Sequence, residues 1–303
     1  MAGCLMDIRQ LRSFIRVVEQ ASISRAAQSL HMAQPSLSQR IRELEREVGV
    51  ALLQRHSGGV RPTEAGAMVA DRARAILRLV DTMVSEAQSA GREPVGQVIV
   101  GLPTTMALHL TLPLVQLVQK LYPKIRLRVS EGMSGHVQEW VHSGRLDIAV
   151  LYTADPVPGL ALEELVKEDL CLVSAHDPAL AGQDIRNAEL VEYPLVLPSP
   201  DHGLRRSIEA GWRRVDRPLD VVAEIDSLVH LKRLAMDSGL HTILPAAACR
   251  DEVLAGKLMC RRVLDPPLRR PIAMATSTSR PLSVAGQHIY GIVKGMVRDA
   301  VRA

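Results

Sequence analysis

The stretch from Ser24 to Gly49, SRAAQSLHMAQPSLSQRIRELEREVG, constrains the fold more than any other part of the chain. Gln34-Pro35-Ser36 can begin a helix, because proline is tolerated in the first helical turn, where its missing N–H would have no partner. Apolar residues then recur every three or four positions, and Gly49 can end the helix. The sequence therefore predicts an amphipathic helix with one buried stripe, formed by Leu37, Ile41, Leu44 and Val48.

A shorter helix is predicted directly before this one. Ser24 can cap a helix that runs through Leu30, and the paired Ala26 and Ala27 are small enough to let a second helix cross closely. His31-Met32-Ala33 has the length of the turn in a helix-turn-helix. The opposite side of the second helix consists of hydrogen-bonding and cationic groups that suit contacts with DNA. The helix residues predicted to make these contacts are Gln34, Pro35, Ser36, Ser38, Gln39 and Arg42.

An exposed polar helix face is not specific by itself, because any amphipathic helix places Arg and Gln in solvent. The local charge is more informative: residues 1–62 contain nine arginines, no lysine and five acidic residues, and their net charge of +4 equals that of the whole chain. Phosphate contacts require such a localised cationic surface. Arg55-His56-Ser57-Gly58-Gly59-Val60-Arg61 adds a Gly-Gly turn between two extended arms. We therefore predict a winged helix-turn-helix in which Arg55 and Arg61 contact phosphates.

Two further helices flank this region. Asp7 can cap a helix to about Gln20, with Phe14, the only phenylalanine, at the centre of a small core. Thr63 can cap a helix to about Ser89, roughly 40 Å long. One partner for its apolar stripe is the same helix of a second copy; the alternative is that it lies along its own domain. The stripe consists of Met68, Ala73, Ile76, Leu77, Val80, Met83, Val84 and Ala87.

Residues 7–66 resemble the N-terminal domain of LysR-type transcriptional regulators. The match runs from DIRQLRSFIRVVEQ through AAQSLHMAQPSLSQRIRELEREVGVALLQR to RPTEAG and follows the family pattern AAxxLxxxQPxxSxxIxxLExxxGxxLxxR. The resemblance implies a bacterial, ligand-responsive transcription factor that forms a homodimer through the long helix, and a homotetramer. Two recognition helices would then meet two half-sites about one helical turn apart on double-stranded DNA.

Beyond Gly91-Arg92-Glu93-Pro94, short apolar strands alternate with helices, which indicates a mostly parallel α/β sheet. This order resembles the LysR-family effector domain, which is like a periplasmic solute-binding protein with two α/β lobes joined by two crossover strands. The predicted fold class is thus α plus α/β: a winged helix-turn-helix at 1–62, a dimerisation linker helix at 63–90 and an effector domain at 91–303. We place one lobe at about 95–162 plus 266–303 and the other at about 163–265. Strands are predicted at 97–101, 125–129, 146–151, 166–174, 191–197, 221–224, 241–244 and 270–275, and helices at 107–121, 134–143, 227–238 and 283–301.

A ligand is expected between the lobes, where strands end and helices begin. Free backbone N–H groups and the helix dipole favour an anion at such positions, which suggests a small anionic metabolite as the effector. Each hydroxyl in the predicted set could instead only cap a helix, and Arg205 could be a solvated surface arginine. The set comprises Thr104, Thr105, Ser134, Leu151, Tyr152, Ser199, His202, Arg205 and Thr242.

Other functional classes find little support in the sequence. GxSxG, P-loop, GxGxxG and HExxH motifs are absent and the ten histidines show no metal-ligand spacing, so no enzyme, cofactor or metal site is predicted. Cys4, Cys171, Cys249 and Cys260 form no CxxC pair. No cleavable signal and no run of about 18 apolar residues occurs, so we expect a cytoplasmic protein without membrane contact. The competing hypothesis is an effector-independent DNA-binding protein whose α/β domain only oligomerises.

Overall fold

The computed structural model describes residues 6–56, 58–89, 93–153, 155–180, 182–212 and 217–302. They form two compact units, one N-terminal and one from Glu93 onward. Gly91 and Arg92, where a helix break was predicted, lie outside the described residues. So do Cys4 and, in the predicted wing turn, Ser57. No helix in the described ranges is both long and apolar enough to cross a membrane.

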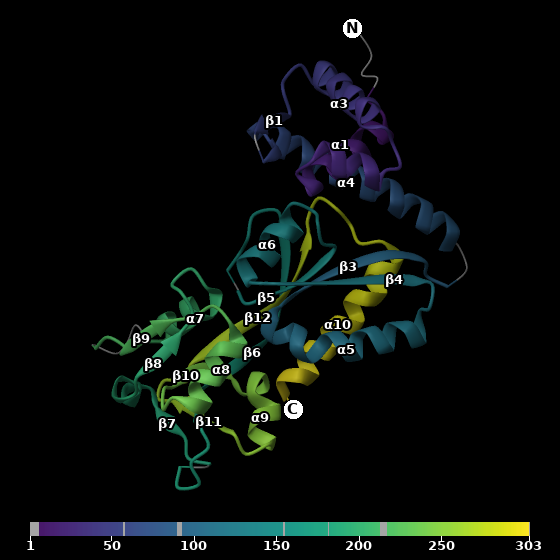
Figure 1. The fold of residues 1–303 in the computed structure, drawn as a ribbon. Coiled ribbons are helices and arrows are strands. Elements are labelled where there is room, and N and C mark those ends of the chain that lie inside the picture. Colours follow the sequence, from purple (N-terminus) through teal and green to yellow (C-terminus); the bar gives the residue numbers. More distant parts are fainter. Residues whose placement is uncertain are drawn as a thin grey trace. The chain divides into compact units, whose positions relative to one another are not determined.

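The first unit is a winged helix-turn-helix (Figure 1). Asp7 accepts a hydrogen bond from the Gln10 N–H at 2.7 Å and caps the first helix as predicted. The predicted cap at Ser24 is wrong: the cap lies two residues earlier, at Ser22, whose hydroxyl accepts from the Arg25 N–H. Phe14 is fully buried at the centre of the core. The elements are α1 (Ile8–Gln20), α2 (Ile23–Ser29), α3 (Gln34–Val48), β1 (Leu53–His56), β2 (Gly59–Pro62) and α4 (Glu64–Ser89).

The wing, which consists of strands β1 and β2, is hydrogen-bonded to the helical part of the unit at both of its ends. The Val60 N–H donates to the Ala21 carbonyl at 3.0 Å, and a Cβ on Gly59 would lie 2.3 Å from that same oxygen. Gly59 also has φ of +133°, so only glycine fits there. At the other end the Glu45 carboxylate of α3 accepts from the N–H groups of Leu52 and Leu53 at 2.8 and 3.1 Å. The wing is therefore held in a fixed position relative to α3.

Helix α4 divides its apolar residues between two faces. Ala65, Val69, Ala70, Ala73 and Leu77 pack against the core of their own unit, so the predicted single stripe is wrong for Ala73 and Leu77. The other face is in solvent: Met68, Ile76, Leu79, Met83 and Val84 are 62, 45, 64, 61 and 45% exposed. The sequence pattern combined these two faces because both repeat at helical spacing.

The second unit is built on a mixed eight-stranded sheet with the order β4-β3-β5-β12-β6-β11-β7, in which β10 also pairs with β6. Strands β8 and β9 form a separate parallel pair. The prediction of a mostly parallel sheet is wrong, because β12 runs antiparallel to β5 and β6, and β10 and β11 run antiparallel to β6. The strands are β3 (Gly96–Pro103), β4 (Ile125–Gly132), β5 (Ile148–Leu151), β6 (Leu160–Ala175), β7 (Ile185–Arg186), β8 (Leu195–Leu197), β9 (Val221–Glu224), β10 (Thr242–Pro245), β11 (Leu258–Leu264) and β12 (Arg269–Ser277).

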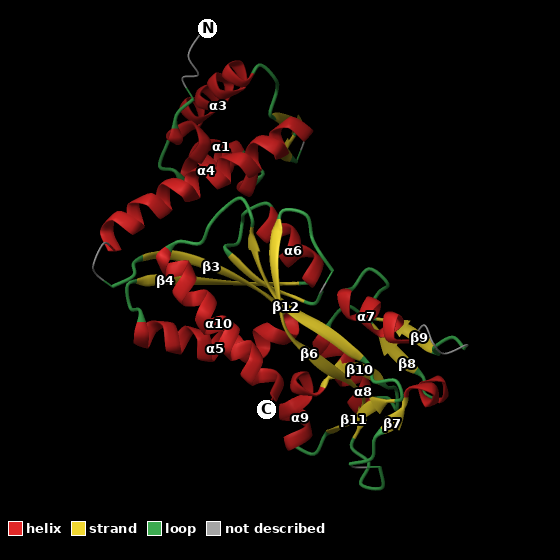
Figure 2. Cartoon of the chain, turned by 180° about the vertical axis from the view of Figure 1, so that it is seen from behind, coloured by secondary structure: helices red, strands yellow, loops and turns green. Residues whose placement is uncertain are grey.

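Helices cover this unit on both faces of the first lobe (Figure 2). Helices α5 and α10 pack against one face, where Ile148 and Val150 of β5 point, and α6 packs against the other, where Ala149 and Leu151 point. Successive side chains of β5 thus belong alternately to two apolar cores, one on each face of the sheet. The helices are α5 (Thr104–Leu121), α6 (Ser134–His142), α7 (Gly203–Trp212), α8 (Leu228–Asp237), α9 (Arg250–Leu254) and α10 (Val284–Arg302), with 3-10 turns η1 (Asn187–Glu192) and η2 (Ala246–Cys249).

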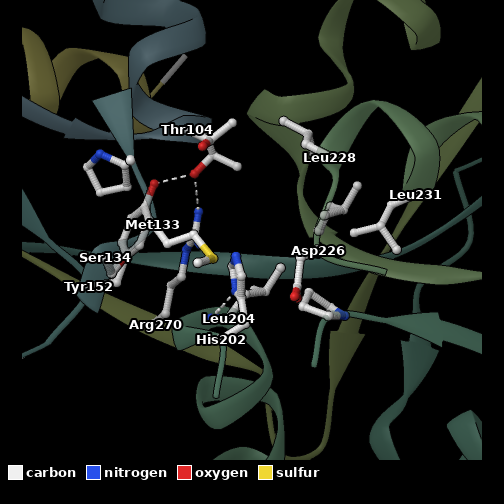
Figure 3. Close-up of a pocket in the computed structure, with 15 residues that line it drawn as sticks. Thr104, Met133, Ser134, Tyr152, His202, Leu204, Asp226, Leu228, Leu231 and Arg270 are labelled. Atoms are coloured by element: carbon white, nitrogen blue, oxygen red, sulfur yellow. Dashed lines mark hydrogen bonds between the residues drawn. The ribbon is translucent and has the colours of Figure 1, made fainter. Parts of the chain in front are cut away.

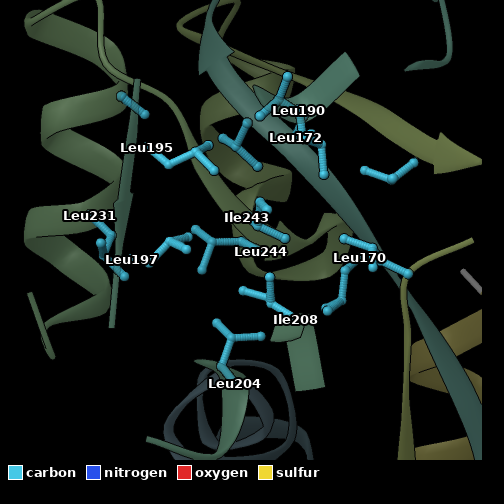
Figure 4. Close-up of a cluster of buried hydrophobic side chains, with 14 of the residues drawn as sticks. Leu170, Leu172, Leu190, Leu195, Leu197, Leu204, Ile208, Leu231, Ile243 and Leu244 are labelled. Carbon is cyan, nitrogen blue, oxygen red and sulfur yellow. The ribbon is translucent and has the colours of Figure 1, made fainter. Parts of the chain in front are cut away.

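Two long strands connect the lobes. The first half of β6 pairs with β12 and its second half with β10 and β11, so β6 and β12 both run from one lobe into the other. The second lobe encloses its own apolar core (Figure 4), in which Leu170, Leu195, Leu204, Leu231 and Leu244 come from five different elements. This arrangement leaves the ends of strands and the starts of helices facing the space between the lobes.

Candidate DNA-binding surface and ligand pocket

The outer face of α3 presents most of the residues predicted to contact DNA. Gln34, Pro35, Ser36, Gln39 and Arg42 are exposed. Ser38 is only 9% exposed, because it follows Leu37 directly on the inward side of the helix. Ser38 thus offers less surface than the other five, and its contact with DNA stays a prediction.

Gln39 has partners within its own helix. Its amide nitrogen donates to the Glu43 carboxylate at 2.8 Å, and its amide oxygen accepts from the Arg42 guanidinium at 3.1 Å. A base contact by Gln39 therefore requires an exchange of these exposed hydrogen bonds for bonds to a base edge. Glu43, one turn along α3 from Gln39, was not among the residues predicted for the DNA-binding surface.

The wing adds cationic groups beside α3. Arg55 and Arg61 are exposed, and the Arg61 Nε donates to the Gln54 side chain at 3.1 Å. Arg40 of α3, by contrast, donates to the Ser13 hydroxyl of α1 at 3.1 Å and is turned toward the core. The exposed arginines of the wing and α3 thus form a surface suited to phosphate contacts.

The second unit contains a pocket between its lobes, a cavity of about 50 Å³ (Figure 3). Helices α5 and α6 begin at its wall in the first lobe, and α7 and α8 in the second. Five of the nine predicted effector residues line it: Thr104, Thr105, Ser134, Tyr152 and His202. The remaining lining residues are Pro103, Gly132, Met133, Pro198, Leu204, Asp226, Leu228, Leu231, Leu244 and Arg270.

The other four predicted effector residues lie outside the pocket wall. Leu151 points into the core under α6, and Thr242 is fully buried within β10. Ser199 donates from its N–H and its hydroxyl to the carboxylate of the lining residue Asp226, each at 2.9 Å. Arg205 donates a hydrogen bond to the Pro198 carbonyl at 3.0 Å and forms ion pairs with Glu209 and Glu224.

A buried arginine forms one wall of the pocket. Arg270 is 1% exposed; its Nε donates to Glu168, and its Nη2 donates to the Thr105 hydroxyl at 2.9 Å. Its guanidinium lies 3.5 Å from the centre of the Tyr152 ring, whose hydroxyl is hydrogen-bonded to Thr105. Burial raises the pKa of Tyr152 to about 12, so its hydroxyl is neutral. The sequence signal for this group is an arginine at the start of an otherwise apolar strand, and Arg270 was not among the residues predicted to bind the effector.

The second lobe contributes one carboxylate and one imidazole. Hydrogen bonds from Ser199 lower the pKa of Asp226, which is therefore ionised at neutral pH. Burial lowers the pKa of His202, whose Nδ1 accepts from the Leu204 N–H at 3.1 Å, so this imidazole is neutral. Within the described ranges, no three His, Cys, Asp or Glu side chains gather as they would around a metal ion.

Comparison with known families divides the chain in the same way. Residues 8–67 match the model described as bacterial regulatory helix-turn-helix protein, lysR family, and residues 91–297 match the LysR substrate binding domain. The nitrogen assimilation regulatory protein nac of Klebsiella aerogenes is 33% identical over 294 residues, which cover 96% of this chain and 95% of that protein. The DNA-binding transcriptional dual regulator OxyR of Escherichia coli K12 is 29% identical and covers 91% of each chain.

Solved structures show the same fold. A mutant form of full-length OxyR from Pseudomonas aeruginosa superposes with a TM-score of 0.77 at 21% identity and covers 97% of this chain and 98% of its own. Full-length CbnR in complex with its target DNA has a TM-score of 0.67 at 22% identity and covers 97% of this chain and 100% of its own. The relatives are regulators, in agreement with the prediction that the chain is not an enzyme. The chain belongs to the LysR family of DNA-binding transcriptional regulators, with an N-terminal helix-turn-helix and a substrate-binding domain.

Proposed function

We propose that the chain binds two half-sites of double-stranded DNA as a homo-oligomer, and that a small molecule in the pocket between the lobes controls this binding. The observation that supports it most directly is the pocket itself, in which a buried arginine and the starts of four helices face one cavity. Closure of two lobes on a ligand can change the spacing between subunits, and so between recognition helices. The proposed division is 1–62 for DNA, 63–90 for dimerisation and 91–303 for the effector.

The exposed face of α4 supports the dimer. Met68, Ile76, Leu79, Met83 and Val84 expose large apolar side chains along one helix, and the same face of a second copy can bury them. This face accounts for the length of α4 beyond its contacts with its own core. The dimer through α4, and a tetramer built from two such dimers, belong to the proposal.

The pocket supports an effector that carries an anionic group. Among the residues that the structure describes, the Nη1 of Arg270 has no hydrogen-bond partner, whereas Nε and Nη2 have Glu168 and Thr105. A planar guanidinium donates well to a carboxylate, and the N-terminal turns of α5 and α6 add backbone N–H groups. The cavity is small, so the effector fits in this conformation only if it is compact.

The DNA contacts predict two distinct mutant phenotypes. Gln39→Ala should relax sequence preference at one position of each half-site, at a cost of about 1 to 3 kcal/mol on the specific site, because an amide is lost at a base edge. Arg61→Ala should weaken binding to every sequence and reduce the salt slope by about one unit, because a phosphate contact is lost. Arg55→Ala should behave in the same way.

Binding titrations on specific and random duplexes at several salt concentrations distinguish the two classes. Gln54→Ala, which removes only the partner of Arg61 in the wing, serves as a control and should change neither quantity strongly. Equal losses on specific and random DNA for Gln39→Ala would refute the base contact. A salt slope that is unchanged in Arg61→Ala would remove the wing from the DNA interface.

A further inference from the structure

We infer that the pocket binds a small zwitterion, a molecule such as an amino acid that carries both a carboxylate and a protonated amine. The inference rests on the proposed effector function and adds the second charge of the ligand. It derives from two ionised groups that different elements bring to one cavity, Arg270 of β12 and Asp226 before α8.

The charges of the lining residues favour a ligand that carries both a negative and a positive charge. Arg270 is already balanced by the buried Glu168, while Tyr152 and His202 are neutral. Asp226, which is exposed at the rim of the pocket, has no ion-pair partner among the residues that the structure describes. A plain anion would add a second negative charge near it, whereas a zwitterion adds none and gives Asp226 a cation.

The geometry separates the two charged ends. Figure 3 shows Asp226 on the side of Leu228 and Leu231, away from Tyr152 and Ser134, with Arg270 nearer the latter pair. A carboxylate near Arg270 would lie beside the first turns of α5 and α6, and an ammonium near Asp226 would lie beside the second lobe. One ligand with both groups would thus bridge the lobes.

The hydrogen bonds that Asp226 already accepts leave it able to bind an ammonium group. Two donors of Ser199 orient the carboxylate, yet a carboxylate has about four acceptor positions, so it can accept further hydrogen bonds from an amine. Charge-assisted hydrogen bonds of this kind are among the strong ones. The apolar side chains of Met133, Leu228, Leu231 and Leu244 line the remaining space and suit a short aliphatic side chain.

The test uses matched probes that differ by one charged group. Calorimetric titration of the full chain compares alanine with propionate, which lacks the amine, and with ethylamine, which lacks the carboxylate; glycine and acetate form a second pair. We expect each amino acid to bind about tenfold or more tightly than its acid, as expected for one charge-assisted hydrogen bond. Ethylamine should bind more weakly than alanine because it has no group for Arg270.

Two variants assign the ends of the ligand. Asp226→Asn should reduce the alanine-to-propionate ratio to about one, and Arg270→Lys, which keeps the charge but not the planar fork, should weaken alanine and propionate alike by about tenfold. Asp237→Asn makes the same chemical change at the exposed end of α8 and should leave all affinities unchanged.

The outcomes separate this inference from the proposed function. Propionate binding as tightly as alanine would overturn the zwitterion and leave an anionic effector in place. A preference for alanine that persists in Asp226→Asn would overturn the role of Asp226. If neither the amino acids nor the acids bind, the zwitterion is overturned, while the proposed function is decided separately by the response of DNA binding to a ligand.

Discussion

Replacing Arg270 by methionine should destabilise the second unit by about 3 to 5 kcal/mol. The reason is the partner that remains: Glu168 is almost fully buried, with its side chain 6% exposed, and would lose the guanidinium that compensates its charge. Breaking a buried ion pair from one side leaves an uncompensated charge in a medium of low dielectric constant. Thermal or urea unfolding followed by tryptophan fluorescence measures the loss, because Trp140 and Trp212 lie in the first and second lobes of this unit.

Two variants test the cause of this loss. Arg269→Met removes the neighbouring arginine on the same strand, whose pair with Asp169 is about half exposed, and should cost less than about 1 kcal/mol. The double substitution Arg270→Met with Glu168→Gln should recover a large part of the stability, because no charge is left buried. If Arg270→Met alone unfolds at the same denaturant concentration as the unsubstituted chain, the buried pair has no structural importance.

Phe14→Ala should unfold the DNA-binding unit at a cost of about 3 to 5 kcal/mol, which is a large fraction of the stability of a domain this small. Phe14 is fully buried among Leu37, Ile41 and Leu44, so truncation leaves a cavity under the recognition helix. DNA binding and part of the far-UV circular dichroism should be lost. The tryptophan unfolding transition should not move, because both tryptophans belong to the second unit.

The milder substitution Phe14→Leu provides the control. It keeps an apolar side chain in the core and should retain DNA binding with a smaller loss of stability. A Phe14→Ala variant that binds specific DNA with unchanged affinity at 37 °C would show that the core does not depend on this ring.

The N-terminal unit was largely predictable because its signals are local. The apolar positions of α3 repeat within one helix, and its end at Gly49 has the left-handed φ of +84° that glycine permits. The error at Ser24 was a shift of a helix start, where Ser22 competes as a cap only two residues away. Ser38 is less exposed than its neighbours Gln34, Ser36 and Gln39, because a polar residue beside an apolar stripe can face either way.

The pocket was only partly predictable because its members meet across long sequence distances. Thr105 and Arg270 form a hydrogen bond although 165 positions separate them, and no local pattern connects them. The pocket residues were predicted well where a residue shortly after a strand begins a helix, as Thr104 and Ser134 do. The predictions for Leu151 and Thr242 were wrong. Successive side chains of a strand point to opposite faces, so an error of one position along the strand turns the side chain away from the cleft.

The two faces of α4 show a different limit. The sequence gives the helical period but not which residues its own domain covers, so Leu77 and Met83 looked alike. Only the packing of the first half of α4 against the core distinguishes the buried face from the exposed face that we assign to the dimer.

The most direct test of the account is a footprint on the DNA upstream of the chain's own coding sequence, with and without saturating alanine. We predict that the unsubstituted protein protects two half-sites on one face of the DNA and that alanine changes the length or spacing of the protected region, whereas in Asp226→Asn the same alanine concentration changes it less. A footprint that is identical with and without a ligand shown by calorimetry to occupy the pocket would contradict the account and favour an effector-independent DNA-binding protein.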